Sequence, residues 1–146
     1  MPTTETEADA EAILEHMVSH TLEIMCFAEA RRLPSQPPIV RPVAARIDFS
    51  GSRAGHLQLE IDPAAARALA AAFLGLEPWH PSLESHIQDV TQELARVLSG
   101  RLVTSLDPEA PFEMKTASAG SIEPKETIRQ AFRLSAGTLS VTLQLS

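Results

Sequence analysis

Residues 83–106 read LESHIQDVTQELARVLSGRLVTSL, and this stretch decides the fold. Apolar side chains recur in it every three or four positions, which is the period of an α-helix with one buried side. The members of this apolar stripe are Leu83, Ile87, Val90, Leu94, Val97, Leu98 and Leu102. The stretch therefore predicts a long helix over residues 83–106 that packs one side against a core.

The polar side of this predicted helix carries Asp89, Gln92, Glu93 and Arg96, which we expect to project into solvent. Glu93 and Arg96 are three positions apart, so they lie about 60° apart around the helix axis and can form an ion pair. Asp89 and Gln92 repeat the same spacing four residues earlier. Two interpretations stay open: a solvated salt bridge worth a few tenths of a kcal/mol, or a docking face that carries part of a catalytic pair.

Two hairpins and a single strand are predicted around this helix. Residues 43–62, VAARIDFSGSRAGHLQLEID, alternate apolar and polar side chains on both sides of the turn SGSRAG. Residues 128–135 and 138–145 form a second such pair around SAGT, and residues 112–118 read as a further strand. Together these segments predict an antiparallel sheet.

Two further helices are predicted, and a proline-rich connector follows the first of them. Apolar residues return to one side over residues 10–32, and four prolines then make residues 33–42 an extended connector. In DPAAARALAAAFLG, Asp62 is the expected N-cap, Pro63 the first helical residue and Gly75 the C-terminal stop.

The order of these elements is helix, two strands, two helices and three strands. This order predicts an α+β fold in which the helices pack on a mainly antiparallel sheet. A chain of 146 residues is long enough for one domain, which we assign to residues 10–146. Residues 1–9 are polar and acidic, without apolar periodicity, and are predicted to be a flexible tail.

Composition limits the partners and the compartment. The net charge of −7 disfavours nucleic acid and anionic membranes as partners, and no apolar run reaches the length of a membrane span. The lone Cys26 cannot form an internal disulfide, and the first residues lack the pattern of a signal peptide. We therefore expect a cytoplasmic protein.

His16, His20 and Glu23 share one side of the first helix at a spacing that can supply metal ligands. They lack the sequence context of a zinc motif, such as a glutamate directly after the first histidine. We therefore expect a polar or interface stripe there, with no metal and no cofactor.

Four segments, taken in order, resemble a known family. The hairpin ARIDFSGSRAGHLQLEID, the helix PAAARALAAAFLG, the segment ELARVLSG and the first-helix segment HTLEIMCFAEA resemble the CheC/CheX/FliY group of chemotaxis phosphatases. The resemblance is strongest to CheX-like domains and covers nearly the whole chain after residue 10. It implies the fold of that family and a place in bacterial chemotaxis or two-component signalling.

The resemblance also implies a partner and a site. In the family, a glutamate and an asparagine three residues later act on a phosphorylated receiver of the CheY type. The glutamate pairs with a receiver lysine, and the asparagine holds the water that hydrolyses the aspartyl phosphate. Glu93 and Gly100 match this pattern, but Arg96 stands where the asparagine is expected. The resemblance implies that Glu93, Arg96 and Gly100 bind the receiver, and the repeated spacing adds Asp89 and Gln92. The catalytic candidates are Glu93, Arg96 and Gln92.

Arginine changes the expected chemistry, because its side chain donates hydrogen bonds but accepts none. Arg96 can bind phosphate, yet it cannot orient the attacking water as an amide does. We therefore expect docking with poor or no hydrolysis, unless a receiver shifted by one turn meets Asp89 and Gln92, whose amide keeps an acceptor.

The alternative is a non-enzymatic receiver-binding or dimerisation module. A homodimer is expected for two reasons: the resemblance implies it, since some relatives dimerise, and an open antiparallel sheet leaves edge groups free to pair.

Overall fold

The computed structural model describes residues 2–51, 54–106, 112–116 and 126–145. The helices are α1 (Pro2–Cys26), α2 (Pro63–Leu74) and α3 (Ile87–Leu106), and a 3₁₀ turn, η1 (Leu83–His86), leads into α3. The strands are β1 (Arg31–Arg32), β2 (Val43–Gly51), β3 (Gly55–Ile61), β4 (Phe112–Thr116), β5 (Glu126–Leu134) and β6 (Gly137–Leu145). No helix within the described segments is long and apolar enough to cross a membrane.

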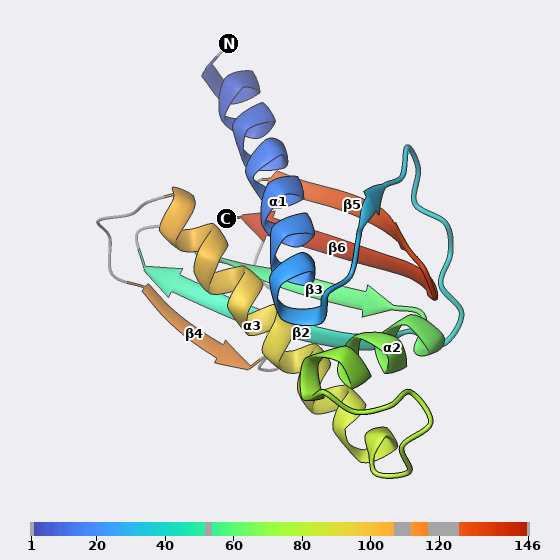
Figure 1. The fold of residues 1–146 in the computed structure, drawn as a ribbon. Coiled ribbons are helices and arrows are strands. Elements are labelled where there is room, and N and C mark those ends of the chain that lie inside the picture. Colours follow the sequence, from blue (N-terminus) through green and yellow to red (C-terminus); the bar gives the residue numbers. More distant parts are fainter. Residues whose placement is uncertain (1, 52–53, 107–111, 117–125, 146) are drawn as a thin grey trace.

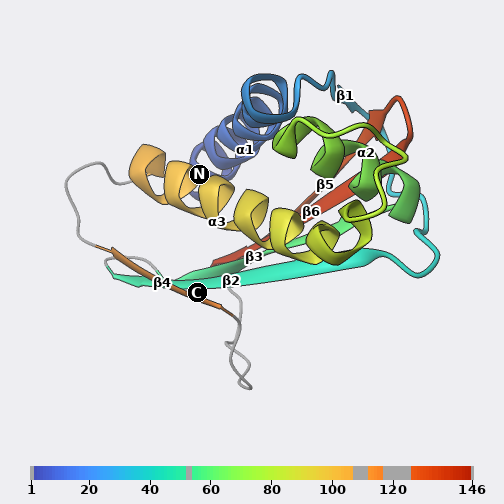
Figure 2. The same cartoon turned by 60° about the horizontal axis from the view of Figure 1, so that its bottom comes forward.

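The six strands form one sheet in the order β1-β5-β6-β3-β2-β4, and every neighbouring pair is antiparallel. The two predicted hairpins are β2–β3 and β5–β6, and the pairing of β3 with β6 joins them. Figures 1 and 2 show the three helices on one face of this sheet. The predicted α+β class, with helices packed on an antiparallel sheet, is therefore confirmed. Of the predicted strand 112–118, residues 117–118 lie outside the described residues.

The core lies between the helices and the sheet. Because side chains alternate along a strand, Leu57, Leu59 and Ile61 of β3 all point to the helical side, where they are fully buried. The predicted stripe of the long helix is buried against them, except for Val97. Val97 is only partly buried, because it lies at the edge of the interface and lines a surface groove.

The bounds of α1 differ from the predicted helix 10–32. The helix begins at Pro2, so residues 2–9, predicted as a tail, form its first turns; proline is accepted at the first position of a helix, where its missing N–H costs nothing. It ends at Cys26, because Phe27 adopts a left-handed backbone conformation with φ 52°. Arg31 and Arg32 then pair with β5 as an edge strand that was not predicted.

The start of α2 shows a second difference. Pro63 and Gly75 occupy the predicted first and terminating positions, but the side chain of Asp62 does not cap the helix. Its Oδ2 instead accepts a hydrogen bond of 2.7 Å from the backbone N–H of Thr138. Asp62 therefore ties the start of α2 to the β5–β6 turn, where a Cβ on Gly137 would come within 2.7 Å of the same oxygen.

Candidate functional site

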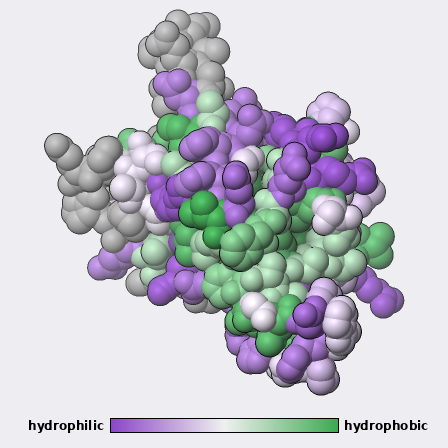
Figure 3. Space-filling model, in the orientation of Figure 1, coloured by the Kyte–Doolittle hydropathy of each residue, from purple (hydrophilic) through white to green (hydrophobic). Residues whose placement is uncertain are grey.

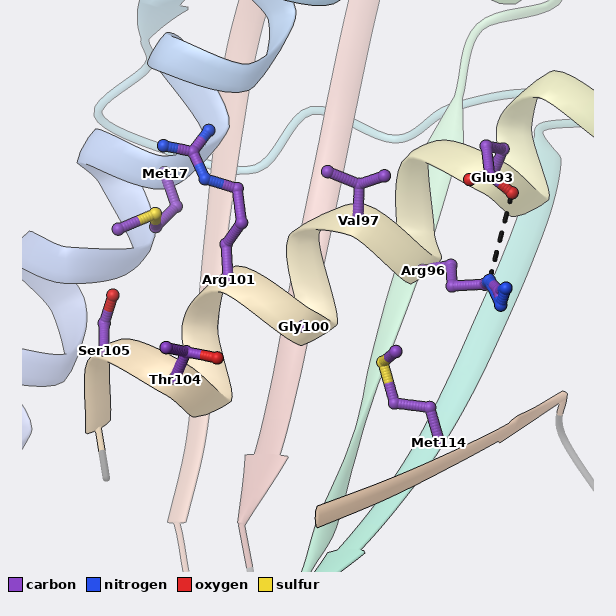
Figure 4. Close-up of a pocket in the computed structure, with 9 residues that line it drawn as sticks. All are labelled: Met17, Glu93, Arg96, Val97, Gly100, Arg101, Thr104, Ser105 and Met114. Atoms are coloured by element: carbon purple, nitrogen blue, oxygen red, sulfur yellow. Dashed lines mark ion pairs between the residues drawn. The ribbon is translucent and has the colours of Figure 1, made fainter. Parts of the chain in front are cut away.

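The outer face of α3 carries Asp89, Glu93 and Arg96, all of them exposed. The side chains of Glu93 and Arg96 are 48% and 55% exposed, and Glu93 Oε2 lies 3.9 Å from Arg96 Nε (Figure 4). An ion pair this exposed contributes only a few tenths of a kcal/mol. The two groups therefore separate at little cost, and each can bind a partner.

Gln92 differs from its neighbours, because its side chain is partly buried and lies toward the sheet. Its Nε2 donates to the carbonyl of Arg46 at 3.2 Å, and Nε2 of Gln88 donates to the carbonyl of Ala44 at 2.8 Å. The pairing of β2 with β4 begins only at Ile47, so the two glutamines cover the part of the β2 edge that β4 leaves open. The prediction that Gln92 projects freely into solvent is therefore wrong.

A groove of about 620 Å³ continues from the Glu93–Arg96 pair along α3, between α1 and β4 (Figure 4). Met17 of α1 and Met114 of β4 form apolar walls, and Val97 and Gly100 lie between them. A Cβ on Gly100 would lie 3.6 Å from Met114 Cε, which is ordinary contact. A larger residue at position 100 would therefore narrow the groove, although the fold itself could accommodate a Cβ there.

Arg101 holds one wall of this groove in place. Its Nη1 donates to Thr21 Oγ1 at 2.7 Å, and its Nη2 lies 2.9 Å from His20 Nδ1. Because a guanidinium only donates, Nδ1 of His20 is the acceptor. The sequence did not single out Arg101, since its partners on α1 are about 80 residues away.

The histidines of α1 are engaged in contacts with protein groups. The His16 ring stacks on the His20 ring with the centroids 5.6 Å apart, and His20 binds Arg101. Within the described segments, no group of three or more His, Cys, Asp or Glu side chains is placed to hold a metal ion. Cys26 is buried, which raises the pKa of its thiol to about 11 and keeps it protonated at neutral pH.

Comparison with known families identifies the chain. The model of the family described as chemotaxis phosphatase CheX matches residues 43–129, which is more than half of the sequence. The chain belongs to the CheX family. The match includes the β2–β3 hairpin, α2 and the whole of α3, so the outer face of α3 lies inside the region that defines the family.

Solved structures share this fold at low sequence identity. CheX from Vibrio vulnificus is 17% identical over 94% of this chain and 96% of its own, with a TM-score of 0.68. CheX from Desulfovibrio desulfuricans is 16% identical over 94% and 99%, with a TM-score of 0.69. A chain of the CheX–CheY–BeF3–Mg2+ complex from Borrelia burgdorferi is 15% identical over 92% of this chain and 96% of its own, with a TM-score of 0.65. No curated protein matches the sequence.

Proposed function

We propose that this chain binds a phosphorylated CheY-type receiver through the outer face of α3 and hydrolyses its aspartyl phosphate poorly or not at all. The observation that carries the proposal is the exposed Glu93–Arg96 pair, held one turn apart on the anchored helix of a CheX family member. The Borrelia burgdorferi structure, in which a CheX is in complex with CheY, BeF3 and Mg2+, supports the class of partner.

The proposed contacts follow from the exposed groups. Glu93 leaves its weak pair with Arg96 and binds a lysine of the receiver, while Arg96 reaches the phosphoryl oxygens. Asp89 extends the contact toward the start of α3, and Gly100 permits close approach of the receiver next to the groove. Any magnesium belongs to the receiver, and the chain supplies no cofactor of its own.

The proposed loss of hydrolysis follows from the chemistry of position 96. Water attacks the phosphorus in line, the bond from phosphorus to the aspartyl oxygen breaks, and inorganic phosphate and a free carboxylate form. The attacking water must be held by a hydrogen-bond acceptor, and the Arg96 guanidinium has none. The Arg96 guanidinium can stabilise the charge of the transition state. The loss of water positioning alone is nevertheless expected to lower the rate of hydrolysis by a factor of about 100.

Gln92 is the remaining candidate for an acceptor. Its amide nitrogen donates a hydrogen bond to the carbonyl of Arg46. Its amide oxygen is therefore the atom that could accept a hydrogen bond from water at a bound receiver. A receiver shifted by one turn toward Asp89 is needed for that contact. If Gln92→Ala leaves any residual phosphate release unchanged, Gln92 has no part in the chemistry.

The deciding experiment uses the cognate receiver in two states. Binding of the BeF3-loaded receiver, measured by calorimetry, tests docking; phosphate release from the acetyl-phosphate-loaded receiver tests hydrolysis. We expect binding that depends on BeF3, together with release no faster than that of the receiver alone. If the receiver binds in neither state, the proposed docking is wrong. If phosphate is released rapidly, the proposed loss of hydrolysis is wrong.

The second candidate is a non-enzymatic receiver-binding or dimerisation module in the cytoplasm, with residues 10–146 as its domain. Arg96 favours it, because the water-holding amide of the family is absent. A homodimer through sheet edges would use β1 or β4, because α3 covers part of β2. Binding that does not depend on BeF3 favours this candidate.

A further inference from the structure

Hollows with apolar walls lie at two places on the helical side of the molecule, and their surroundings differ. One, of about 200 Å³, lies at the end of α1, where Phe27 lines it and is itself 84% exposed. Figure 3 shows hydrophobic surface over this end of α1 and over α2. None of the described residues that line this pocket is charged, so nothing there specifies an occupant. The other hollow is the groove that begins at Glu93 and Arg96.

The floor of the groove is one face of α3. Glu93, Val97, Gly100 and Thr104 are three or four positions apart and all line it, so the floor follows α3 for about three turns, or roughly 16 Å. Val97 belongs to the predicted apolar stripe, but the fold leaves it partly open here. Gly100 contributes no side chain, so the space above the middle of the floor stays free.

The walls of the groove are two methionines. Met17 of α1 lies on one side of α3 and Met114 of β4 on the other (Figure 4). Both are partly buried and pack against the core, and the pairing of Met114 with Phe49 fixes its place on the sheet. A methionine side chain is unbranched and polarizable, so it adapts its shape to an apolar neighbour. Walls of this kind suit an apolar side chain of a partner.

The charged groups that line the groove leave its middle apolar. Arg101 lines it too, but its guanidinium already donates to two side chains of α1. The weak Glu93–Arg96 pair at one end is therefore what the groove offers to charged groups of a partner. Between this pair and the exposed Ser105 at the other end, the space over Gly100 offers apolar contact.

We propose that a receiver docked on Glu93 and Arg96 also fills this groove, with a large apolar side chain seated over Gly100 between Met17 and Met114. The inference rests on the proposed function and names a second contact of the same partner. The occupant is the receiver because Glu93 and Arg96 line the groove themselves, so a partner that binds them also covers its mouth. A groove of about 620 Å³ has room for a short segment of chain around that side chain.

The two contacts have different effects on binding. Exposed charged pairs steer and orient a partner but contribute little affinity. An apolar side chain that becomes buried contributes more, and a few such residues carry most of the affinity of an interface. The groove therefore sets how tightly the receiver is held, while Arg96 contacts the phosphoryl group.

The first experiment observes the groove in the complex. The sequence has four methionines, and Met25 lies on α1 outside the groove, so it is an internal control. In a chain with isotope-labelled methionine methyl groups, the BeF3-loaded receiver is expected to shift the NMR signals of Met17 and Met114 and to leave Met25 unchanged. If the receiver binds and neither signal shifts, the groove is empty in the complex; the inference is then wrong, although the proposed function stands.

Two other outcomes of this experiment also decide against the inference. If the receiver does not bind at all, the proposed function and the inference are both wrong. If the signals of Met17 and Met114 shift when the chain alone is concentrated, the groove is a contact between copies of this chain, and the receiver is not its occupant.

Substitutions test whether the groove contributes affinity. Met17→Gln makes one wall polar at nearly the same length and helix propensity, and is expected to weaken binding of the BeF3-loaded receiver about 10-fold in calorimetry. Met25→Gln is the matched control on the same helix, also at a partly buried position, and should change nothing. Gly100→Leu fills the groove from its floor and is expected to weaken binding about 30-fold. Its fold is kept, because leucine favours helix and a Cβ there meets only ordinary contacts.

Salt separates the apolar contact from the charged one. The loss of affinity in Glu93→Ala is expected to shrink between about 0.1 M and about 1 M salt, because exposed charges are screened. The loss in Met17→Gln is expected to persist. Equal dissociation constants for Met17→Gln and Met25→Gln overturn the inference, and so does a Met17→Gln loss that disappears in high salt.

Discussion

The outer face of α3 and the surface around Phe27 are both presented by helices that the core holds in place, but they differ in chemistry. The α3 face displays a weak ion pair of exposed charges, whereas the Phe27 surface displays an aromatic ring beside an apolar pocket. Charged contacts form and separate readily and suit a transient partner, while wholly apolar contacts suit a lasting one. The α3 face therefore suits the transient receiver contact proposed above, whereas the chemistry of the Phe27 surface suits a more lasting apolar contact.

Restoring a hydrogen-bond acceptor at position 96 of the α3 face is expected to change activity more than any other substitution. Arg96→Asn is expected to raise phosphate release from a loaded receiver about 100-fold, because the amide oxygen can hold the attacking water. Arg129→Asn makes the same chemical change at an exposed position of β5 and should have no effect. An unmodified chain that is already fast, with no gain from Arg96→Asn, removes the basis for the proposed impairment.

A second prediction concerns affinity at the same face. Glu93→Ala is expected to weaken binding of the BeF3-loaded receiver about 30-fold, because the receiver lysine then loses its partner in the interface. Glu77→Ala removes an exposed carboxylate from the connector after α2 and serves as the control. If calorimetric titrations give the same dissociation constant for both variants, the docking face lies elsewhere on the molecule.

The two surfaces also differ in how far the sequence reveals them. Glu93 and Arg96 could be placed on the solvent side of α3 because they are polar residues outside a regular apolar stripe. Phe27 could not be recognised, because an aromatic residue after EIMC continues an apolar pattern and reads as core. Its exposure depends on where α1 stops, and a left-handed residue other than glycine leaves no sequence signal.

Most of the fold followed from local patterns, and several of the misses are contacts between distant parts of the chain. The hairpins, α2 and the long helix were predicted because alternation and helical periodicity are local properties. The Arg101–Thr21 contact, β1, and the bond from Gln92 to the Arg46 carbonyl join residues far apart in the chain. Such contacts depend on how the elements pack, which periodicity does not specify.

The hydrogen bond from Gln92 to the Arg46 carbonyl attaches α3 to β2. Gln92→Glu is expected to destabilise the fold by about 1 kcal/mol, because a carboxylate cannot donate to the carbonyl of Arg46 and faces it unfavourably. Gln58→Glu, at a partly buried position of β3, is the control for the added charge. Urea unfolding checks both, and equal stability of the two variants shows that the bond to β2 contributes nothing.

The smallest expected effect is a pH dependence of stability, which comes from a histidine on the sheet face opposite the helices. His56 alternates with Leu57 along β3, so it lies on that opposite face, and it is only 6% exposed. Burial lowers the pKa of His56, and the Arg46 charge adds to this, against the opposing effects of Asp48 and a hydrogen bond with Gln144. The unfolded chain therefore binds a proton more readily than the folded one, so the stability from His56 is complete above about pH 6.5 and falls as the pH drops below it. His56→Gln should reduce the loss of unfolding free energy between about pH 7.5 and about pH 5.5, measured with urea. A loss of the same size in His56→Gln as in the unmodified chain assigns the acid sensitivity to other groups.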